Sequence, residues 1–351
     1  LLVAVGALGR GAPFKECVTH GWTVDGEGKA MHKSLGNGMD PAEIFDKYGA
    51  DLLRLWAGSA DYHVDVRCSD EIFKQLSQNY LKFRNTCKFC LDNLVGFDAD
   101  HLVQPDEMLP LDKWAVTRLN TLIEKVFAAY DNYEFHVVSH MVNDFCVVDL
   151  SSFYFDIIKD RLYCGEENSL ERRSAQSAVW MILDAMTRLF APILAFTCDE
   201  VWLAMPHRAG DDARNVLLNQ MVQPYAAYAL SEEEMGKWAR LAALRTAVNG
   251  ALEQARADKT IGKSLEAEVD LTVTAEDAFL TDMDAADLAD LLIVSQVRVE
   301  VGAEQDVAVR PANGAKCLRC WKVLPTVGSD AGHPDLCPRC AAVVKNLPVI
   351  E

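Results

Sequence analysis

Hydrophobic residues recur at steps of three and four through four long stretches of the chain, a period that predicts amphipathic helices. Pro192 should end or kink the last of these helices, because proline lacks the backbone donor that a helix interior needs. Polar segments at 98–110 and 165–171 separate the stretches, so we expect a helical bundle in the middle of the chain. The four stretches cover residues 72–94, 114–130, 138–148 and 179–193.

The pattern differs before the bundle. Residues 14–24 are rich in β-formers and predict a strand, which runs into a loop framed by glycines and closed by Gly36 and Gly38. Asp40-Pro41 then has the form of an N-cap followed by a proline in the first helical turn. We therefore expect a strand, a mobile loop and a helix, in this order.

The pattern after the bundle predicts a small α/β segment. The capping sequence that begins at Ser231 indicates the start of a helix over residues 231–257. Alternating hydrophobic residues predict strands over 265–273 and 297–301, with a helix near 288–293 between them.

The composition is that of a globular protein, with 50% apolar and 25% charged residues, and 351 residues predict two or three domains. The apolar start, residues 1–5, is too short to span a membrane and lacks the basic stretch of a signal peptide. We expect a fragment boundary there and no membrane association. The eleven cysteines are an odd number in a long chain, which favours free thiols in a reducing cytoplasm.

The net charge of −18 argues against general attraction to nucleic acids, since the chain repels a polyanion on average. Residues 310–345 differ, because they hold six Lys or Arg and two Asp, a net charge of +4. Contact with a polyanion is therefore expected at this tail.

Two Cys-x2-Cys pairs in the same tail predict a metal site. Cys317 and Cys320 are separated from Cys337 and Cys340 by sixteen residues, a spacing that places four thiolates around one tetrahedral zinc ion. With all four positions filled by protein, this Zn²⁺ should be structural. By contrast, the pair at residues 87 and 90 has no partner pair, and we interpret its thiols as packed core.

Trp321 directly follows the second cysteine, and two interpretations of it are open. Its ring is either a hydrophobic cover for the knuckle or a platform on which an unpaired base stacks. Because Arg319 lies beside it in the basic tail, RNA contact by Arg319 and Trp321 is a reasonable hypothesis.

A second candidate site is the glycine-framed loop. It contains Lys33 and Ser34, where the ammonium group can bind phosphate oxygens and the hydroxyl can add a hydrogen bond. Lys-Ser in a loop is a weak signal by itself, because an exposed loop lysine is the usual case.

The surrounding residues strengthen this signal. The segments 19–26, 31–37 and 49–56 together resemble the second signature of class I aminoacyl-tRNA synthetases, Lys-Met-Ser-Lys-Ser, in its isoleucine branch. The resemblance covers essentially the whole chain. It continues through residues 111–115, 133–136, 143–154, 159–163, 189–197 and 261–267.

The resemblance implies an ATP-binding loop of Met31, His32, Lys33 and Ser34. Lys33 corresponds to the second lysine of the signature and would be catalytic, stabilising charge that develops toward pyrophosphate. Met31 and Ser34 match the signature, whereas His32 replaces its serine and Ala30 its first lysine.

The same resemblance implies the fold and the partners. We expect a multidomain, mainly α chain that binds tRNA(Ile) through an anticodon-binding bundle, uses ATP with Mg²⁺, and works as a cytoplasmic monomer. The first class I signature, the isoleucine pocket and the editing domain would lie upstream, so residues 1–351 alone should be inactive. The expected parts are the end of a Rossmann-type catalytic domain (1–60), a linking helical segment (61–105), the anticodon-binding bundle (106–230), a helix with the small α/β segment (231–306) and a zinc knuckle (307–351).

Two alternatives remain at this point. A synthetase for valine, leucine or methionine would share the loop and the bundle, although the Cys-Leu-Arg-Cys-Trp knuckle at 317–321 favours isoleucine. A non-catalytic RNA-binding protein could combine a bundle with a zinc knuckle, but this would leave the pattern over 19–37 unexplained.

Overall fold

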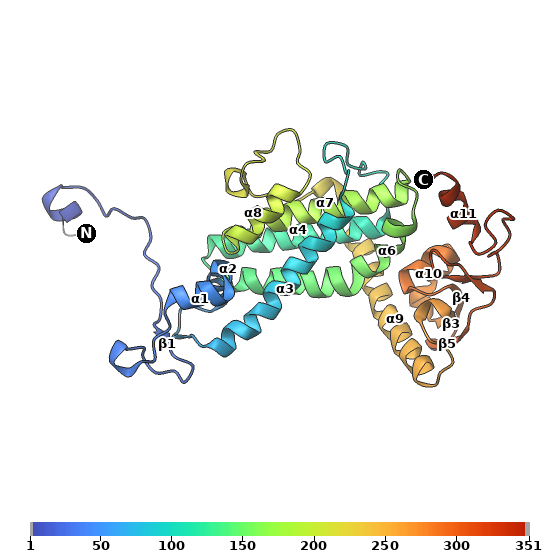
Figure 1. Ribbon diagram of the computed structural model, residues 1–351, viewed down its shortest axis with the longest axis horizontal. Coiled ribbons are helices and arrows are strands. Elements are labelled where there is room, and N and C mark those ends of the chain that lie inside the picture. The colour runs from blue at the N-terminus through green and yellow to red at the C-terminus, as the bar shows by residue number, and fades with distance from the viewer. Residues whose placement is uncertain (1–2, 348–351) are drawn as a thin grey trace.

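The computed structural model describes residues 3–347, apart from the side chains of Ala4 and Lys33. Figure 1 shows three parts along the long axis: an extended N-terminal segment with two short helices, a central helical bundle, and a C-terminal body that holds the sheet. The chain is mainly α, as the sequence predicted.

The N-terminal part is organised around one short parallel ladder. Strand β1 is limited to two residues, so the strand predicted over 14–24 was wrong for most of its length. The reason is the lack of a partner, because β2 pairs only with the end of that segment. The predicted cap is confirmed, since the Asp40 side chain accepts from Ala42 N. The elements are β1 (Thr23–Val24), α1 (Pro41–Tyr48), α2 (Ala50–Ser59) and β2 (Val66–Arg67).

The bundle confirms the helices predicted from the hydrophobic period. Helix α7 is its centre and is buried on all sides over residues 174–187, as expected for a helix surrounded by others. It ends at Phe190, two residues before Pro192, as predicted. The helices are α3 (Asp70–Asn93), α4 (Pro110–Asp131), α5 (Phe135–Asp144), α6 (Phe155–Cys164), α7 (Leu170–Phe190) and α8 (Ala195–Ala204).

A π-helix over Phe145–Tyr154 joins α5 to α6 and was not predicted. The three segments form one continuous rod, because the backbone stays helical from α5 through α6. The C-terminal body contacts this rod through α9. The buried Arg245 of α9 (Glu232–Ala257) donates to Ser152 O (3.1 Å) and to Asp156 (3.3 Å) of the rod.

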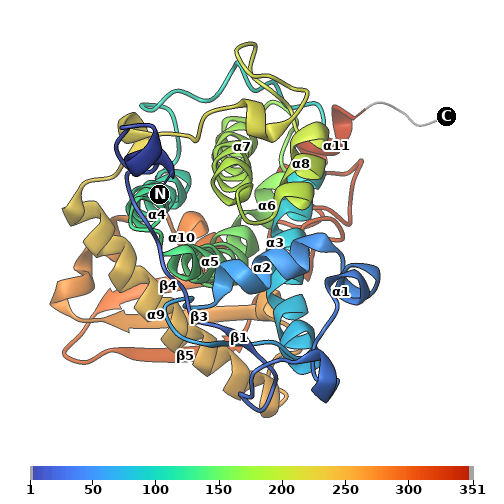
Figure 2. The same cartoon turned by 90° about the vertical axis from the view of Figure 1, so that its left-hand side faces the viewer.

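The C-terminal body contains a three-stranded sheet with the order β4-β3-β5. Strand β3 runs parallel to β4 and antiparallel to β5, and Figure 2 shows α9 lying along the sheet. Helix α9 and its capping box were predicted, as were β3 and β4, whereas β5 was missed. The remaining elements are β3 (Ala267–Val273), α10 (Ala285–Leu292), β4 (Gln296–Val301), β5 (Asp306–Pro311), β6 (Ala315–Lys316), β7 (Val323–Leu324) and α11 (Pro338–Lys345).

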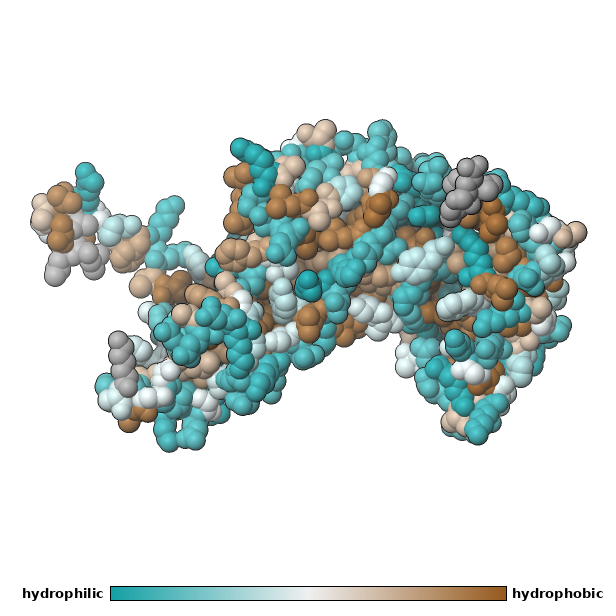
Figure 3. Space-filling model, in the orientation of Figure 1, coloured by the Kyte–Doolittle hydropathy of each residue, from teal (hydrophilic) through white to brown (hydrophobic). Residues whose placement is uncertain are grey.

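The distribution of hydrophobic side chains over the surface differs between the bundle and the C-terminal body. In Figure 3 hydrophobic side chains gather over the bundle, whereas the tip of the C-terminal body is hydrophilic. Across residues 3–347, no helix combines the length and the apolar character needed to cross a membrane.

A buried carboxylate joins three helices of the bundle. Asp112 at the start of α4 is fully buried and accepts from Tyr154 Oη (2.7 Å) and Ser174 Oγ (2.6 Å). Arg161 Nη1 of α6 lies 3.3 Å from the same carboxylate. Burial raises the pKa of Asp112, and the arginine and the two hydroxyl donors oppose this shift.

We expect Asp112→Ala to destabilise the chain by about 3–5 kcal/mol, because it leaves Arg161 and two buried hydroxyl groups without their partner. Urea unfolding monitored by circular dichroism measures the change. Asp212→Ala is the matched control, since Asp212 forms a surface pair with the exposed Arg214 and should leave the unfolding midpoint unchanged. Equal midpoints for the two variants would contradict the role of Asp112.

Candidate functional site

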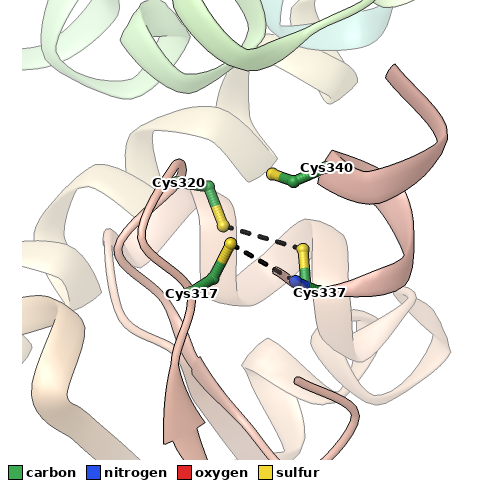
Figure 4. A group of neighbouring side chains, drawn as sticks. All are labelled: Cys317, Cys320, Cys337 and Cys340. Carbon is green, nitrogen blue, oxygen red and sulfur yellow. Dashed lines mark hydrogen bonds between the residues drawn. The ribbon is translucent and has the colours of Figure 1, made fainter. Parts of the chain in front are cut away.

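The four cysteines of the tail converge on one point. Cys317 and Cys320 lie between β6 and β7, Cys337 caps α11, and Cys340 lies in its first turn (Figure 4). All four are buried, and their sulfur atoms lie within 4.8 Å of one another. A tetrahedral site with Zn–S bonds of about 2.3 Å needs sulfur atoms about 3.8 Å apart, and Cys320 Sγ lies 3.9 Å from Cys337 Sγ. The residues therefore fit a zinc ion.

Backbone amides face these sulfur atoms. Cys337 N donates to Cys317 Sγ over 3.4 Å, and Trp321 N donates to Cys317 O over 2.9 Å. Burial by itself would raise the pKa of the Cys317 thiol, but the amide donors of Cys337, Cys320 and Arg319 lower it to about 6. Burial raises the pKa of Cys320 and Cys337. A cation at the centre of the cluster would favour the thiolate form of these buried cysteines.

The hydrophobic core around the knuckle is small. Leu324, Val327 and Leu336 pack against the cysteines, together with the buried thiol of Cys164 from α6. A segment with so little apolar burial depends on its metal for stability. The pair Cys87 and Cys90 is buried in α3, far in the sequence from this cluster, and its interpretation as core thiols is confirmed.

Arg319 is engaged inside the chain. Its Nη1 donates to Cys164 O (2.5 Å) and its Nη2 to Tyr163 O (3.4 Å), both at the C-terminal end of α6. The sequence hypothesis placed Arg319 on RNA beside Trp321. The structure adds a contact of its guanidinium group with the end of α6, which the sequence did not indicate, and RNA contact by Arg319 stays a prediction.

Trp321 is exposed to 54%, so its ring does not serve as a hydrophobic cover for the knuckle. The ammonium groups of Lys263 and Lys316 lie 5.4 and 5.9 Å from its ring centroid. The backbone at Trp321 has a φ of 66°, a left-handed conformation that costs a non-glycine residue about 1–3 kcal/mol. Lys263 was not predicted to take part, because only the fold brings it to the knuckle.

The glycine-framed loop is closed by a carboxylate and an amide. Asp25 accepts from Glu27 N (3.0 Å), Lys29 N (2.8 Å) and Asn37 Nδ2 (2.8 Å). Asn37 Oδ1 in turn accepts from His32 N (2.9 Å). Donation by Asn37 and then by Lys29 N lowers the pKa of Asp25. Asp25 and Asn37 therefore join the two ends of the loop, a role that no sequence pattern indicated.

Within the loop, His32 contacts Ser34. Ser34 N donates to His32 Nδ1 (3.3 Å), and Ser34 Oγ lies 2.6 Å from the same nitrogen. A nitrogen that accepts a hydrogen bond leaves the imidazole proton on Nε2. Lys29 Nζ lies 2.7 Å from Glu27, and this pairing argues against Lys29 replacing the lysine missing at Ala30.

The other loop residues are placed as follows. Met31 is partly buried and packs against the main core. Lys33 begins a 3₁₀ turn, Lys33–Leu35, and its side chain lies outside the described part of the structure. The structure thus brings His32 and Ser34 together and orders the backbone around Lys33.

Three segments match known protein families. Residues 1–69 match the family described as tRNA synthetases class I (I, L, M and V). Residues 112–271 match the anticodon-binding domain of tRNA ligase, and residues 314–343 match a zinc finger found in FPG and IleRS. The zinc-finger match and the buried cysteine cluster together support a structural zinc ion.

Among solved structures, LeuRS of Agrobacterium radiobacter in a ternary complex with tRNA and LeuAMS is similar at 16% identity, with a TM-score of 0.47. The likeness covers 90% of this chain and 29% of that chain.

Curated relatives match over nearly the whole chain. Isoleucine–tRNA ligase of Geobacter sulfurreducens is 45% identical over 98% of this chain, which spans 38% of that protein. The Moorella thermoacetica and Desulforamulus reducens enzymes of the same name are 44% and 46% identical over 99% and 95% of this chain, which spans 39% and 37% of them. The chain thus belongs to the isoleucine–tRNA ligase family of class I tRNA synthetases and spans about 38% of the length of such relatives.

Proposed function

We propose that the chain is the part of an isoleucine–tRNA ligase that binds ATP phosphates through one loop and tRNA through its bundle and knuckle. The observation that carries this proposal is the likeness of nearly the whole chain to isoleucine–tRNA ligases, with a class I segment and a zinc-finger segment in the same chain. The complete enzyme would join isoleucine and ATP into an adenylate, release pyrophosphate, and transfer isoleucine to tRNA(Ile).

The class I segment favours this function over a non-catalytic RNA-binding protein, because such a protein needs no phosphate loop. The valine, leucine and methionine enzymes are disfavoured by the zinc-finger match and by the names of the relatives. We further propose a cytoplasmic monomer that uses Mg²⁺ with ATP.

In the phosphate loop, Lys33 is the catalytic residue. Its ammonium group would bind the phosphate oxygens on which negative charge develops as pyrophosphate leaves. Without phosphate, the Ser34 hydroxyl would donate to His32 Nδ1. When phosphate binds, the same hydroxyl would turn to the phosphate oxygens, because its single proton serves one acceptor at a time. Asp25 and Asn37 are positioning residues, since they fix the two ends of the loop through hydrogen bonds of 2.8–3.0 Å.

In the knuckle, Cys317, Cys320, Cys337 and Cys340 would hold one zinc ion. Four thiolates leave no coordination position for a reacting water, so the ion would supply structure only. The amide donors that face Cys317 would share the negative charge of the thiolates.

The RNA surface of the knuckle is Trp321 with Lys263 and Lys316. The exposed ring would stack on an unpaired base of tRNA, and the two ammonium groups would lie near the adjoining phosphates. The left-handed backbone supports this role, because glycine would fit that position at lower cost.

We expect Cys340→Ser to abolish stoichiometric zinc binding by the chain, because it removes one of four ligands. Metal analysis of the purified protein measures the content. Cys90→Ala removes a core thiol of the other Cys-x2-Cys pair and should leave one zinc ion per chain. Full zinc content in the Cys340 variant would contradict the assignment.

In the full-length ligase, Lys33→Ala should slow isoleucine-dependent pyrophosphate exchange by about 10²–10³-fold, the usual effect of losing one preorganised charge. The dissociation constant for isoleucine should stay unchanged. Lys29→Ala is the matched control and should retain most activity, since Lys29 is paired with Glu27. The assignment fails if exchange and isoleucine binding fall together.

The variant Trp321→Gly distinguishes an effect on RNA binding from an effect on the stability of the fold. It should weaken binding of a tRNA(Ile) anticodon stem-loop by about 1–3 kcal/mol, as expected for loss of one stacked base. It should leave the melting temperature equal or higher, because glycine relieves the left-handed backbone. Trp321→Phe should retain binding. Unchanged affinity of the glycine variant, measured by fluorescence anisotropy, would refute the stacking role.

A further inference from the structure

The last turn of α6 lies between the knuckle and the core of the bundle. Asp160 accepts from Arg339 at 2.5 and 2.9 Å, an ion pair with two parallel hydrogen bonds. The next residue, Arg161, is directed to the other side and pairs with the buried Asp112. Neighbouring residues of one helical turn thus contact the knuckle and the buried network of α4.

The two arginines that meet α6 occupy equivalent places. Arg319 directly precedes Cys320, and Arg339 directly precedes Cys340, so each Cys-x2-Cys pair contributes one arginine. Arg319 donates to two carbonyl groups at the end of α6, and such terminal carbonyls have no partner within their helix. Its Nη1 also lies 3.9 Å from Cys340 Sγ. Each arginine therefore connects a cysteine turn with α6.

The contact also excludes water. The Cys164 thiol, at the end of α6, is 8% exposed and packs with the four cysteines of the knuckle. Its Sγ donates to Arg319 O over 3.6 Å. A fifth cysteine thus closes the interface without belonging to the group of four.

We infer that Arg319, Arg339 and Asp160 couple the zinc state of the knuckle to the stability of the helical bundle. The two cysteine turns hold the guanidinium groups in place only while the four sulfur atoms are held together. When the turns open, Asp160 loses its partner in a half-buried position and the carbonyl groups at the end of α6 lose their donors. Zinc binding and the closed end of the bundle therefore stabilise each other, as linkage requires.

This coupling rests on the proposed zinc site and extends it to the tRNA surface. Because the same contacts fix the knuckle on the bundle, they also fix Trp321 relative to the bundle. Arg319, Arg339 and Asp160 are positioning residues for tRNA binding, and none of them needs to touch RNA.

The test compares the full 351-residue chain with its Arg319→Gln/Arg339→Gln variant, each with zinc and after chelation. Hydrogen exchange of peptides from α6 and the start of α7, read by mass spectrometry, reports the bundle, and metal analysis reports the knuckle. In the unmodified chain, chelation should speed exchange of the α6 end at least tenfold and lower the melting temperature. In the double variant that still holds zinc, exchange of the α6 end should already be fast, and chelation should not change it further.

Two further variants keep the test decisive. Asp160→Asn acts from the bundle side and leaves the knuckle sequence intact, so it covers the case in which the double variant loses zinc. Lys345→Gln is the control, because Lys345 pairs with Asp330 inside the knuckle and should leave the coupling unchanged.

The outcomes separate the two proposals. Zinc bound by the unmodified chain without any effect of chelation on α6 overturns the coupling alone. An equal effect of chelation in the unmodified chain, the double variant and Asp160→Asn does the same. A chain that binds no zinc overturns the zinc site and the coupling together.

Discussion

The constraint on which the rest of this structure depends is electrostatic: a chain with a net charge of −18 repels a polyanion on average, so the proposed tRNA contact needs a local surplus of positive charge. Some of its cations form ion pairs within the fold, as in the pairs of Arg118 with Asp149 and Arg188 with Asp184. Lys263 and Lys316 form no ion pair with a carboxylate within residues 3–347, and both lie at the ring of Trp321. Their positive charge remains available at the exposed ring of Trp321.

The same negative charge of the chain explains why the zinc knuckle needs the arginines beside it. Four thiolates would add negative charge to a chain that already repels phosphate, and a zinc ion cancels only part of it. Arg319 and Arg339 lie close to the sulfur atoms and bring further positive charge to this place. The positive charge of these arginines offsets part of the negative charge beside the proposed RNA surface.

The sequence predicted what depends on local pattern. Helices α3, α4, α7 and α9 follow from hydrophobic period, and the cysteine spacing indicated the cluster that the fold closes. It did not predict what depends on partners distant in the chain. The segment 14–20 has the composition of a strand but lies beside no other strand in the described part of the chain, and β5 is half exposed with a weak alternation.

The direction in which a side chain points could not be predicted from the sequence either. The basic tail suggested that Arg319 contacts RNA, yet a charge pattern cannot show that a guanidinium group faces α6. The link between Asp25 and Asn37 spans twelve positions of a glycine-rich loop, and only the folded backbone brings the two side chains together.

The π-helix of Phe145–Tyr154 has a consequence for how this family can change by insertion and deletion. Each residue of a π-helix turns the chain through a smaller angle than a residue of an α-helix does. The segment therefore decides in which direction the last turn of α6 faces. Removing one residue there would preserve a continuous rod but rotate α6 by roughly a quarter of a turn about its axis. Asp160 would then face away from the knuckle, so the length of this segment is fixed by a contact that lies beyond its own end.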